Sequence, residues 1–396
     1  MRLLTETMPD DEPTITGSGR IGILDLYKGM AIMGVIITHL VLLQNGTDGH
    51  TGDPSAIVQF MFSGLIMFIV ISGYFYKPGK SYLENVRSRV VPLFTIFIVM
   101  TILMTVVMYL YLMVLGYDLS QYDLIDTLLA SVLGKGYAFV DFTSPEFIPY
   151  IDVPAPFFVS TQMYYLGVLC FAYLIFFALI DRVIGDWRKL VATIAVLFLI
   201  SSAYIEFVHL QTPFYIHMVP MFAGFLMVGA LLRKFNFAHF LENGLRDKRY
   251  WIGLFVAIIL TGLTLILFPA DTDITLGKIG DYGIFSVFTF AATSLSCGIT
   301  QLFLAAILLR LPLWNSLFLH MGKEVLPLYL YHMLVCKMLI APFVTLGTDY
   351  NIPLPFAEAL VMAFVTIAVI LVLTYIYRKI LTRTTGDPPR PLPVSG

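Results

Sequence analysis

The sequence predicts an all-α, polytopic membrane protein of about ten transmembrane helices with both termini in the cytoplasm. Of its 396 residues, 58% are hydrophobic and only 13% are charged, and the mean hydropathy is +0.85. This composition excludes an ordinary soluble globular protein. Apolar runs of roughly twenty residues, long enough to cross a bilayer as a helix, recur along the chain. Lys and Arg gather in alternate connections between these runs.

Ten spans follow from apolar runs bounded by charged or Pro/Gly-rich breaks. We expect them near residues 21–43, 57–76, 91–116, 161–180, 190–208, 215–232, 251–268, 282–309, 325–346 and 354–377. The charges give their orientation. One set of connections, including the loops 77–89 and 233–249, holds nearly all Lys and Arg, whereas the other holds only Lys135 and Lys278 among many Asp and Glu. The positive-inside rule then places both termini in the cytoplasm.

The spans form one predicted domain, residues 21–378, between two cytoplasmic tails. Residues 1–20 are acidic and contain no apolar core, so we do not read them as a cleavable signal peptide. Residues 379–396 are predicted to form a tail that is disordered and Pro-rich. Cys170, Cys297 and Cys336 lie inside apolar runs without metal-ligand or disulfide spacing, which predicts packing thiols and no metal site.

A long external connection, residues 117–158, separates the third and fourth spans. Within it, residues 122–133 predict a helix that lies along the membrane interface with its apolar face toward lipid. The remainder is rich in Pro and aromatic residues. Such a loop either covers an external site or simply caps the bundle, and the sequence leaves both interpretations open.

Three polar residues in the first span form a stripe. Eleven steps of about 100° bring His39 within roughly 20° of Lys28, about 16 Å further along the helix. Asp25 lies three residues before Lys28, the spacing at which opposite charges pair on one helix face. Ionisable residues inside a membrane are costly and by default mark function. The stripe therefore indicates a catalytic or a conducting path.

The motifs of the chain resemble, in their order, those of membrane acyltransferase family 3. Members carry Arg or Lys, ten residues and then His in the first span, as do Lys28 and His39 here. The second span ends in Ser-Gly-Tyr-Phe at residues 72–75, and Arg87-Ser-Arg-Val-Val-Pro opens the third. Tyr-Leu-Tyr-His at residues 329–332 is similar to the Tyr-Leu-x-His segment of the family. Lys28 stands where Arg is commoner, and Gln162 begins a segment where many members have Trp-Phe.

This resemblance implies transfer of an acyl group, most simply acetyl, from cytoplasmic acyl-CoA to a hydroxyl of a cell-surface or extracellular glycan. It implies a multi-pass protein of the plasma (inner) membrane that binds no nucleic acid and uses acyl-CoA as co-substrate without a bound cofactor. Many members also carry an external hydrolase-like domain. The chain ends soon after Tyr377, so we expect any such acyl-transfer partner to be a separate protein.

The residues fit that chemistry. A neutral imidazole can remove the proton from an attacking hydroxyl, so His39 is the predicted catalytic base, and a covalent acyl-His intermediate stays open. Lys28, held by Asp25, is predicted to contact CoA or the thioester carbonyl. Arg87 and Arg89 are predicted to bind CoA phosphates, because guanidinium recognises phosphate in a bidentate way. Tyr331, His332 and Gln162 are predicted supporting residues of the site wall.

Each role has a structural alternative. His39 could be a core histidine with internal hydrogen bonds, and Asp25 and Lys28 could form a buried structural ion pair. The arginines could reflect the topology of a basic inner loop alone. His332, in the inner half of the ninth span, is read as a wall or packing residue ahead of a second base. It lies about 140° around the helix from Lys337, so these two do not share a face.

Two further functions remain as alternatives. In a secondary transporter, Asp25, Lys28 and His39 would relay protons. Such proteins often show repeat symmetry, which this sequence lacks. A transmembrane N-acetyltransferase of amino sugars would differ mainly in its acceptor. Phosphate-loop, zinc-protease and hydrolase motifs are absent from the sequence.

Overall fold

Helices account for nearly all of the chain that the structure describes. The computed structural model describes residues 21–42, 56–116, 119, 124–133, 163–208, 212–267, 272–273, 278–279, 283–340 and 356–385. In chain order the α-helices are α1 (Gly22–Leu42), α2 (Ala56–Tyr74), α3 (Tyr82–Asn85), α4 (Val91–Val114), α5 (Leu124–Leu133), α6 (Tyr164–Val183), α7 (Trp187–Phe207), α8 (Val219–Lys234), α9 (Phe237–Asn243), α10 (Lys248–Leu267), α11 (Ser286–Leu308), α12 (Pro312–Lys323), α13 (Val325–Ile340) and α14 (Phe356–Thr385).

Short elements of other kinds join these helices. A π-helical turn, η1 (Val86–Val90), connects α3 to α4, and 3₁₀ turns form η3 (Pro213–Met218), η4 (Gly244–Arg246) and η6 (Gly283–Phe285). The strands β1 (Thr272–Asp273) and β2 (Lys278–Ile279) pair antiparallel over two residues each, with Thr272 opposite Ile279. The described chain is therefore all-α in class.

Eight of the described helices are long and apolar enough to cross a membrane. The two remaining predicted spans contain shorter apolar helices in the described residues, Ser63–Tyr74 and Val325–Leu339. Large apolar side chains cover the outward faces of α4, α7, α10 and α14, where a bilayer would contact them. The chain is a multi-pass membrane protein, and the count of ten spans and the cytoplasmic termini stay predictions.

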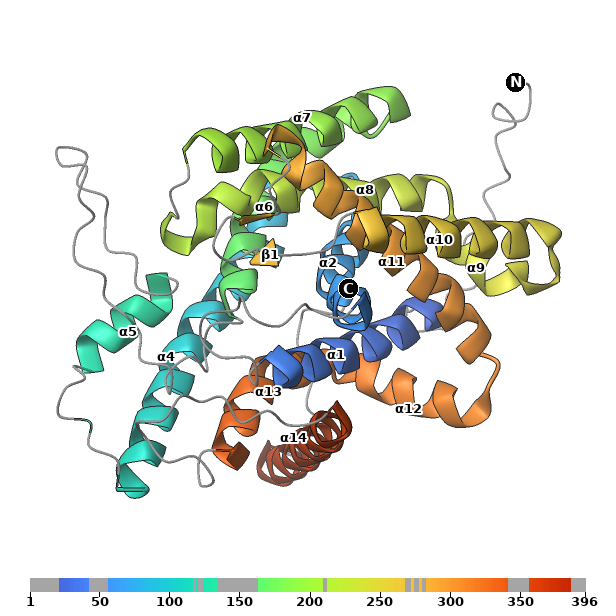
Figure 1. The fold of residues 1–396 in the computed structure, drawn as a ribbon. Helices are drawn as coiled ribbons and strands as arrows, with labels where there is room; N and C mark the ends of the chain where they lie inside the picture. Colours follow the sequence, from blue (N-terminus) through green and yellow to red (C-terminus); the bar gives the residue numbers. More distant parts are fainter. Residues whose placement is uncertain are drawn as a thin grey trace, which may run out of the picture.

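Helix α1 lies at the centre of the bundle. Of the 18 consecutive residues that make its most apolar stretch, 78% are buried, against 22% of the corresponding residues in α10 and in α14. It crosses the middle of the molecule in contact with α2, α11, α12, α13 and α14, while α5 lies at one side and α9 and α12 lie at the other (Figure 1). The polar residues of α1 are therefore enclosed by other helices, as expected for ionisable groups inside a membrane.

Small residues allow the helices around α1 to approach it closely. Gly322 of α12 lies against the backbone carbonyl of Asp25, and Gly29 lies against the carbonyl of Phe318, so each helix uses a glycine where it meets the other. Gly73 of α2 packs in the same way against α8. Close approach through small residues is the usual means of helix association in membranes, where lipid removes the hydrophobic drive.

Charged side chains close the helix ends on the side of α9. Arg233, in the last turn of α8, donates to the carbonyl of Tyr76 just after α2. The Nζ atom of Lys234 lies 2.9 and 2.7 Å from the carbonyl oxygens that follow α6. Glu242 accepts a hydrogen bond from the Ile23 amide at the start of α1, at 3.1 Å. Cations at C-terminal ends and an anion at an N-terminal end match the helix dipoles.

Three segments differ from or extend the sequence prediction. Residues 312–323, expected to be a connection, form the short helix α12. Helix α14 continues to Thr385, into the part of the chain predicted to be a disordered tail; residues 386–396 lie outside the described part. The predicted external helix is present as α5, with Ile125 and Leu129 exposed and Thr127 and Ser131 buried. Ile125 and Leu129 thus face away from the protein.

Candidate active site

The predicted polar stripe lies on one uninterrupted helix. Because α1 is helical from Gly22 to Leu42, the spacing between Lys28 and His39 predicted from the sequence holds. Asp25 Oδ1 accepts a hydrogen bond from Lys28 Nζ at 3.1 Å, and the two side chains are only 10% and 14% exposed. The predicted ion pair is therefore present and is shielded from solvent.

Lys28 also contacts the end of the second helix. Its Nζ atom lies 5.2 Å from the centroid of the Phe75 ring. A cation over an aromatic face is attracted by the ring quadrupole, more strongly where water is excluded. This contact joins the basic residue of the first span to the Ser-Gly-Tyr-Phe segment, two of the motifs that pointed to a family from the sequence.

The two arginines of the third span lie in a helix irregularity. Val86–Val90 form a π-helical turn, in which the amide of Val91 bonds to the carbonyl of Val86. Pro92 follows directly, and proline clashes with the carbonyl four residues before it in a regular helix. The wider turn accommodates that clash. Such single π turns are frequent at functional sites.

The structure separates the environments of these arginines. Arg87 is exposed, whereas Arg89 is half-buried and lies close enough to Tyr173 of α6 for its charge to act on that hydroxyl. Tyr173 in turn lies within reach of Ser72 in α2. Lys28 and Arg89 are thus linked to the same segment, residues 72–75, at the end of α2: Lys28 contacts Phe75, and Arg89 is linked through Tyr173 to Ser72.

His39 is brought next to His332, a residue 293 positions later in the chain. Their ring centroids are 5.3 Å apart and the planes are inclined by 35°. His39 is partly exposed and makes no hydrogen bond among the described residues, whereas His332 is fully buried. The histidine of the first span and the histidine of the Tyr-Leu-Tyr-His segment therefore lie side by side.

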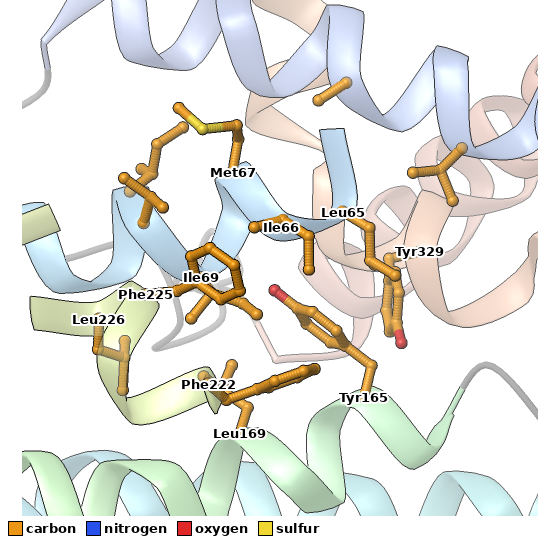
Figure 2. Packing of buried hydrophobic residues seen from close by; sticks show 14 of the residues in the cluster. Leu65, Ile66, Met67, Ile69, Tyr165, Leu169, Phe222, Phe225, Leu226 and Tyr329 are labelled. Atoms are coloured by element: carbon orange, nitrogen blue, oxygen red, sulfur yellow. The ribbon is translucent and has the colours of Figure 1, made fainter. Parts of the chain in front are cut away.

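An aromatic wall continues from His332 toward α6. Tyr329 lies 6.1 Å from His332 between ring centroids, and Tyr165 lies 5.7 Å from Tyr329. Figure 2 shows Tyr329 beside Tyr165, whose hydroxyl points toward Ile66 and Ile69 of α2. That hydroxyl is buried and has no partner among the described residues. The wall is therefore built from aromatic rings of α13 and α6.

Of the other predicted supporting residues, Tyr331 is described by the structure and Gln162 is not. Tyr331 lies toward Tyr377 of α14, so it faces a different helix from its neighbour His332. Gln162 lies outside the described residues. The three cysteines are buried and unpaired, as the sequence suggested. In the described residues no group of three or more His, Cys, Asp and Glu side chains could hold a metal ion.

A polar cluster beside the stripe was missed by the sequence reasoning. Gln301 of α11 accepts a hydrogen bond from the Tyr27 hydroxyl at 2.8 Å and donates to Ser63 Oγ at 3.2 Å, so it joins α1, α11 and α2. All three side chains are buried. A lone amide within an apolar span was the signal in the sequence that could have identified Gln301.

Comparison with known proteins supports an acyltransferase. Residues 21–375 match the acyltransferase domain of the acyltransferase 3 family, which is nearly the whole described bundle. Neither the curated proteins nor the solved structures contain a match to the chain. The matched range contains Lys28, His39, Phe75, Arg87 and Arg89. The chain belongs to the acyltransferase 3 family and is a membrane acyltransferase that moves a group other than an aminoacyl group from an acyl donor to an acceptor.

Proposed function

We propose that this acyltransferase transfers an acyl group, most simply acetyl, from cytoplasmic acyl-CoA to a hydroxyl of a cell-surface or extracellular glycan, in the plasma (inner) membrane. The observation that carries the proposal is the arrangement of Lys28 and His39 on the most buried helix. Both side chains stay partly exposed there, and both are held by or lie next to groups from other helices. The predicted topology turns Lys28 toward the cytoplasm, where acyl-CoA is made, and His39 toward the outside.

His39 acts in this proposal as the general base. The acceptor hydroxyl attacks the thioester carbonyl while a ring nitrogen of His39 takes its proton. A C–O bond forms, the C–S bond breaks, and the proton passes to the departing CoA thiolate, so atoms and charge balance. The His39 ring makes no hydrogen bond among the described residues, so a ring nitrogen can take the proton. General bases typically accelerate such reactions by about 10²- to 10⁴-fold.

Lys28 binds or polarises the acyl donor in this proposal. Its ammonium group is fixed by Asp25 on one side and by the Phe75 ring on another, so its position is set before the donor arrives. A fixed cation can stabilise the negative charge that develops on the thioester oxygen, or bind the polar arm of CoA. Fixed groups are more effective than mobile ones because they do not reorganise during the reaction.

The arginines of η1 bind the phosphates of CoA in this proposal, and they do so unequally. Arg89 lies toward α6 and the end of α2, whereas Arg87 is exposed. We therefore assign the larger contribution to Arg89. Arg89→Ala should raise the KM for acyl-CoA several-fold, and Arg87→Ala is the matched control from the same turn. Equal effects on KM would indicate that both arginines belong to a general basic surface and that neither binds the CoA phosphates specifically.

The alternative mechanisms and functions predict different experimental results. An acyl-His intermediate would trap label on His39 when donor is supplied without acceptor, and an amino-sugar acceptor would yield an amide stable to mild base. A proton relay through Asp25, Lys28 and His39 would need no acyl donor at all. The family assignment favours transfer, since its members act on acyl groups.

The test is a transfer assay in membranes that contain the full chain. Radiolabelled acetyl-CoA and a panel of glycans should give a labelled, base-labile ester, and His39→Ala should abolish it without loss of expression. The exposed residue His320 provides the matched control, His320→Ala, which should transfer normally. Retained transfer in His39→Ala would remove His39 from this role. Absence of label with every glycan would overturn the proposed acceptor class.

A further inference from the structure

His332 is oriented by its own helix. Its Nδ1 atom lies 2.8 Å from the carbonyl oxygen of Tyr329 and 3.2 Å from that of Leu328. A carbonyl oxygen can only accept, so Nδ1 must carry the proton and donate it. In the neutral ring the proton is then absent from Nε2, which keeps a free lone pair. The backbone thus fixes both the orientation and the tautomer of His332.

The free nitrogen of His332 has no partner among the described residues. Nε2 is buried and makes no hydrogen bond there, although a buried polar atom without a partner is costly and uncommon. The nearest aromatic neighbours of the ring are His39 and Tyr329. Two imidazole rings joined by an N–H···N bond have centroids roughly 5 Å apart, given a donor–acceptor distance of about 2.9 Å. The observed 5.3 Å is close to that separation.

We propose that His332 is a positioning residue for His39: its Nε2 accepts a hydrogen bond from one ring nitrogen of His39 and so keeps the other nitrogen unprotonated for the acceptor. The inference rests on the proposed role of His39 as base. Because the backbone carbonyls hold the His332 ring, the bond requires the His39 ring, which makes no hydrogen bond among the described residues, to turn a nitrogen toward Nε2. A base whose orientation is held by a hydrogen bond from behind is a general feature of activated nucleophile and base pairs.

A second buried histidine shows that this arrangement is specific. His217 also has an unpartnered, buried Nε2. Its Nδ1, however, accepts from the Thr212 amide at 3.5 Å, so Nε2 carries the proton and cannot accept. Its ring neighbours are Tyr204 and Tyr215. Of these two residues, only His332 presents an acceptor, and only His332 has a histidine beside it.

Two substitutions separate positioning from packing. In His332→Gln the amide oxygen reaches the place of Nε2 and can still accept from His39. In His332→Asn the shorter amide stays near the place of Nδ1 and can bond only to the backbone. Both are polar and of similar size, so a packing role would be affected about equally. A positioning role would be kept by Gln and lost by Asn.

The first readout needs neither acyl donor nor acceptor. Diethyl pyrocarbonate acylates an unprotonated imidazole nitrogen, and mass spectrometry of the full, detergent-purified chain gives the rate at His39. We expect His332→Gln to keep that rate within about 3-fold and His332→Asn to lower it about 10-fold, the size of one lost hydrogen bond. Exposed His320 is the internal control, and His217→Gln is the control variant. Equal rates in all four proteins would overturn the inference.

The second readout is transfer itself. His332→Asn should lower kcat about 10-fold or more with little change in the KM for acyl-CoA, because His39 and not the donor site is disturbed. His332→Gln should restore most of the kcat. If the reactivity of His39 changes with the substitutions at position 332 but neither the wild type nor any variant transfers acyl groups, the proposed function fails and the inferred hydrogen bond is retained. If transfer occurs and both variants match wild type, the inference fails alone.

Discussion

The ammonium group of Lys28 lies 5.2 Å from the centre of the Phe75 ring, so a cation of the first span is held by an aromatic side chain of the second. This contact predicts a role for the ring in donor binding. Phe75→Leu should raise the KM for acyl-CoA about 3- to 10-fold, the value of a partly desolvated cation–π contact. Phe75→Tyr keeps the ring face and should stay near wild type. Equal KM values for the two variants would contradict the role.

The ion pair between Asp25 and Lys28 predicts a result that separates its two interpretations. Removing one partner leaves a shielded charge, so Asp25→Asn or Lys28→Met should each lower stability, by about 1–3 kcal/mol. Removing both relieves that penalty. If the pair were only structural, the double variant would recover both stability and transfer. We expect thermal unfolding in detergent to recover while transfer stays lost, because Lys28 is needed by the donor.

The contact of Gly322 with the Asp25 carbonyl predicts a strong effect of one added methyl group. A Cβ atom there would overlap that backbone oxygen and force α12 away from α1. Gly322→Ala should cost about 1–3 kcal/mol, as overpacking usually does. Gly262, in α10, faces open space, so Gly262→Ala should be neutral or stabilise by up to about 1 kcal/mol. Melting of both proteins in one detergent measures the difference.

The amide of Gln301 predicts coupling between three helices. Gln301→Leu removes the partner of the Tyr27 hydroxyl and should destabilise the bundle by about 1 kcal/mol, within the range of hydrogen bonds between membrane helices. Tyr27→Phe in that background should add little, because both changes remove the same bond. A fully additive double variant would show that the bond contributes nothing of its own.

The all-α class and the local geometry of α1 could be predicted from the sequence. Helical periodicity depends only on residues that are close in the chain, so the pairing of Asp25 with Lys28 and the helical spacing to His39 could be predicted. The family motifs likewise placed Phe75 and the two arginines in order along the chain. The apolar length of the runs gave the membrane class.

The rest depends on contacts between distant segments. Nothing in the sequence shows that His332 on α13 and His39 on α1 face each other. The sequence therefore predicts only that His332 is a wall or packing residue. The same limit applies to Tyr331, which shares the motif but faces α14. Helix α12 was missed because, at twelve residues, it is too short for a hydropathy window that detects spans. Close glycine contacts such as that of Gly322 likewise cannot be predicted without knowing which residues lie next to the glycine in space.

The predicted topology can be tested directly, because the native thiols are out of reach. Cys170, Cys297 and Cys336 are each at most 1% exposed, so the unmodified chain should react little with a membrane-impermeant maleimide. Lys80 is exposed in the basic connection after α2, and Val208 is 41% exposed at the end of α7. In intact cells Val208→Cys should be labelled and Lys80→Cys should not, and both should react once the membrane is opened. The reverse pattern would place Lys28 at the outer face, and acyl-CoA from the cytoplasm could not then reach it.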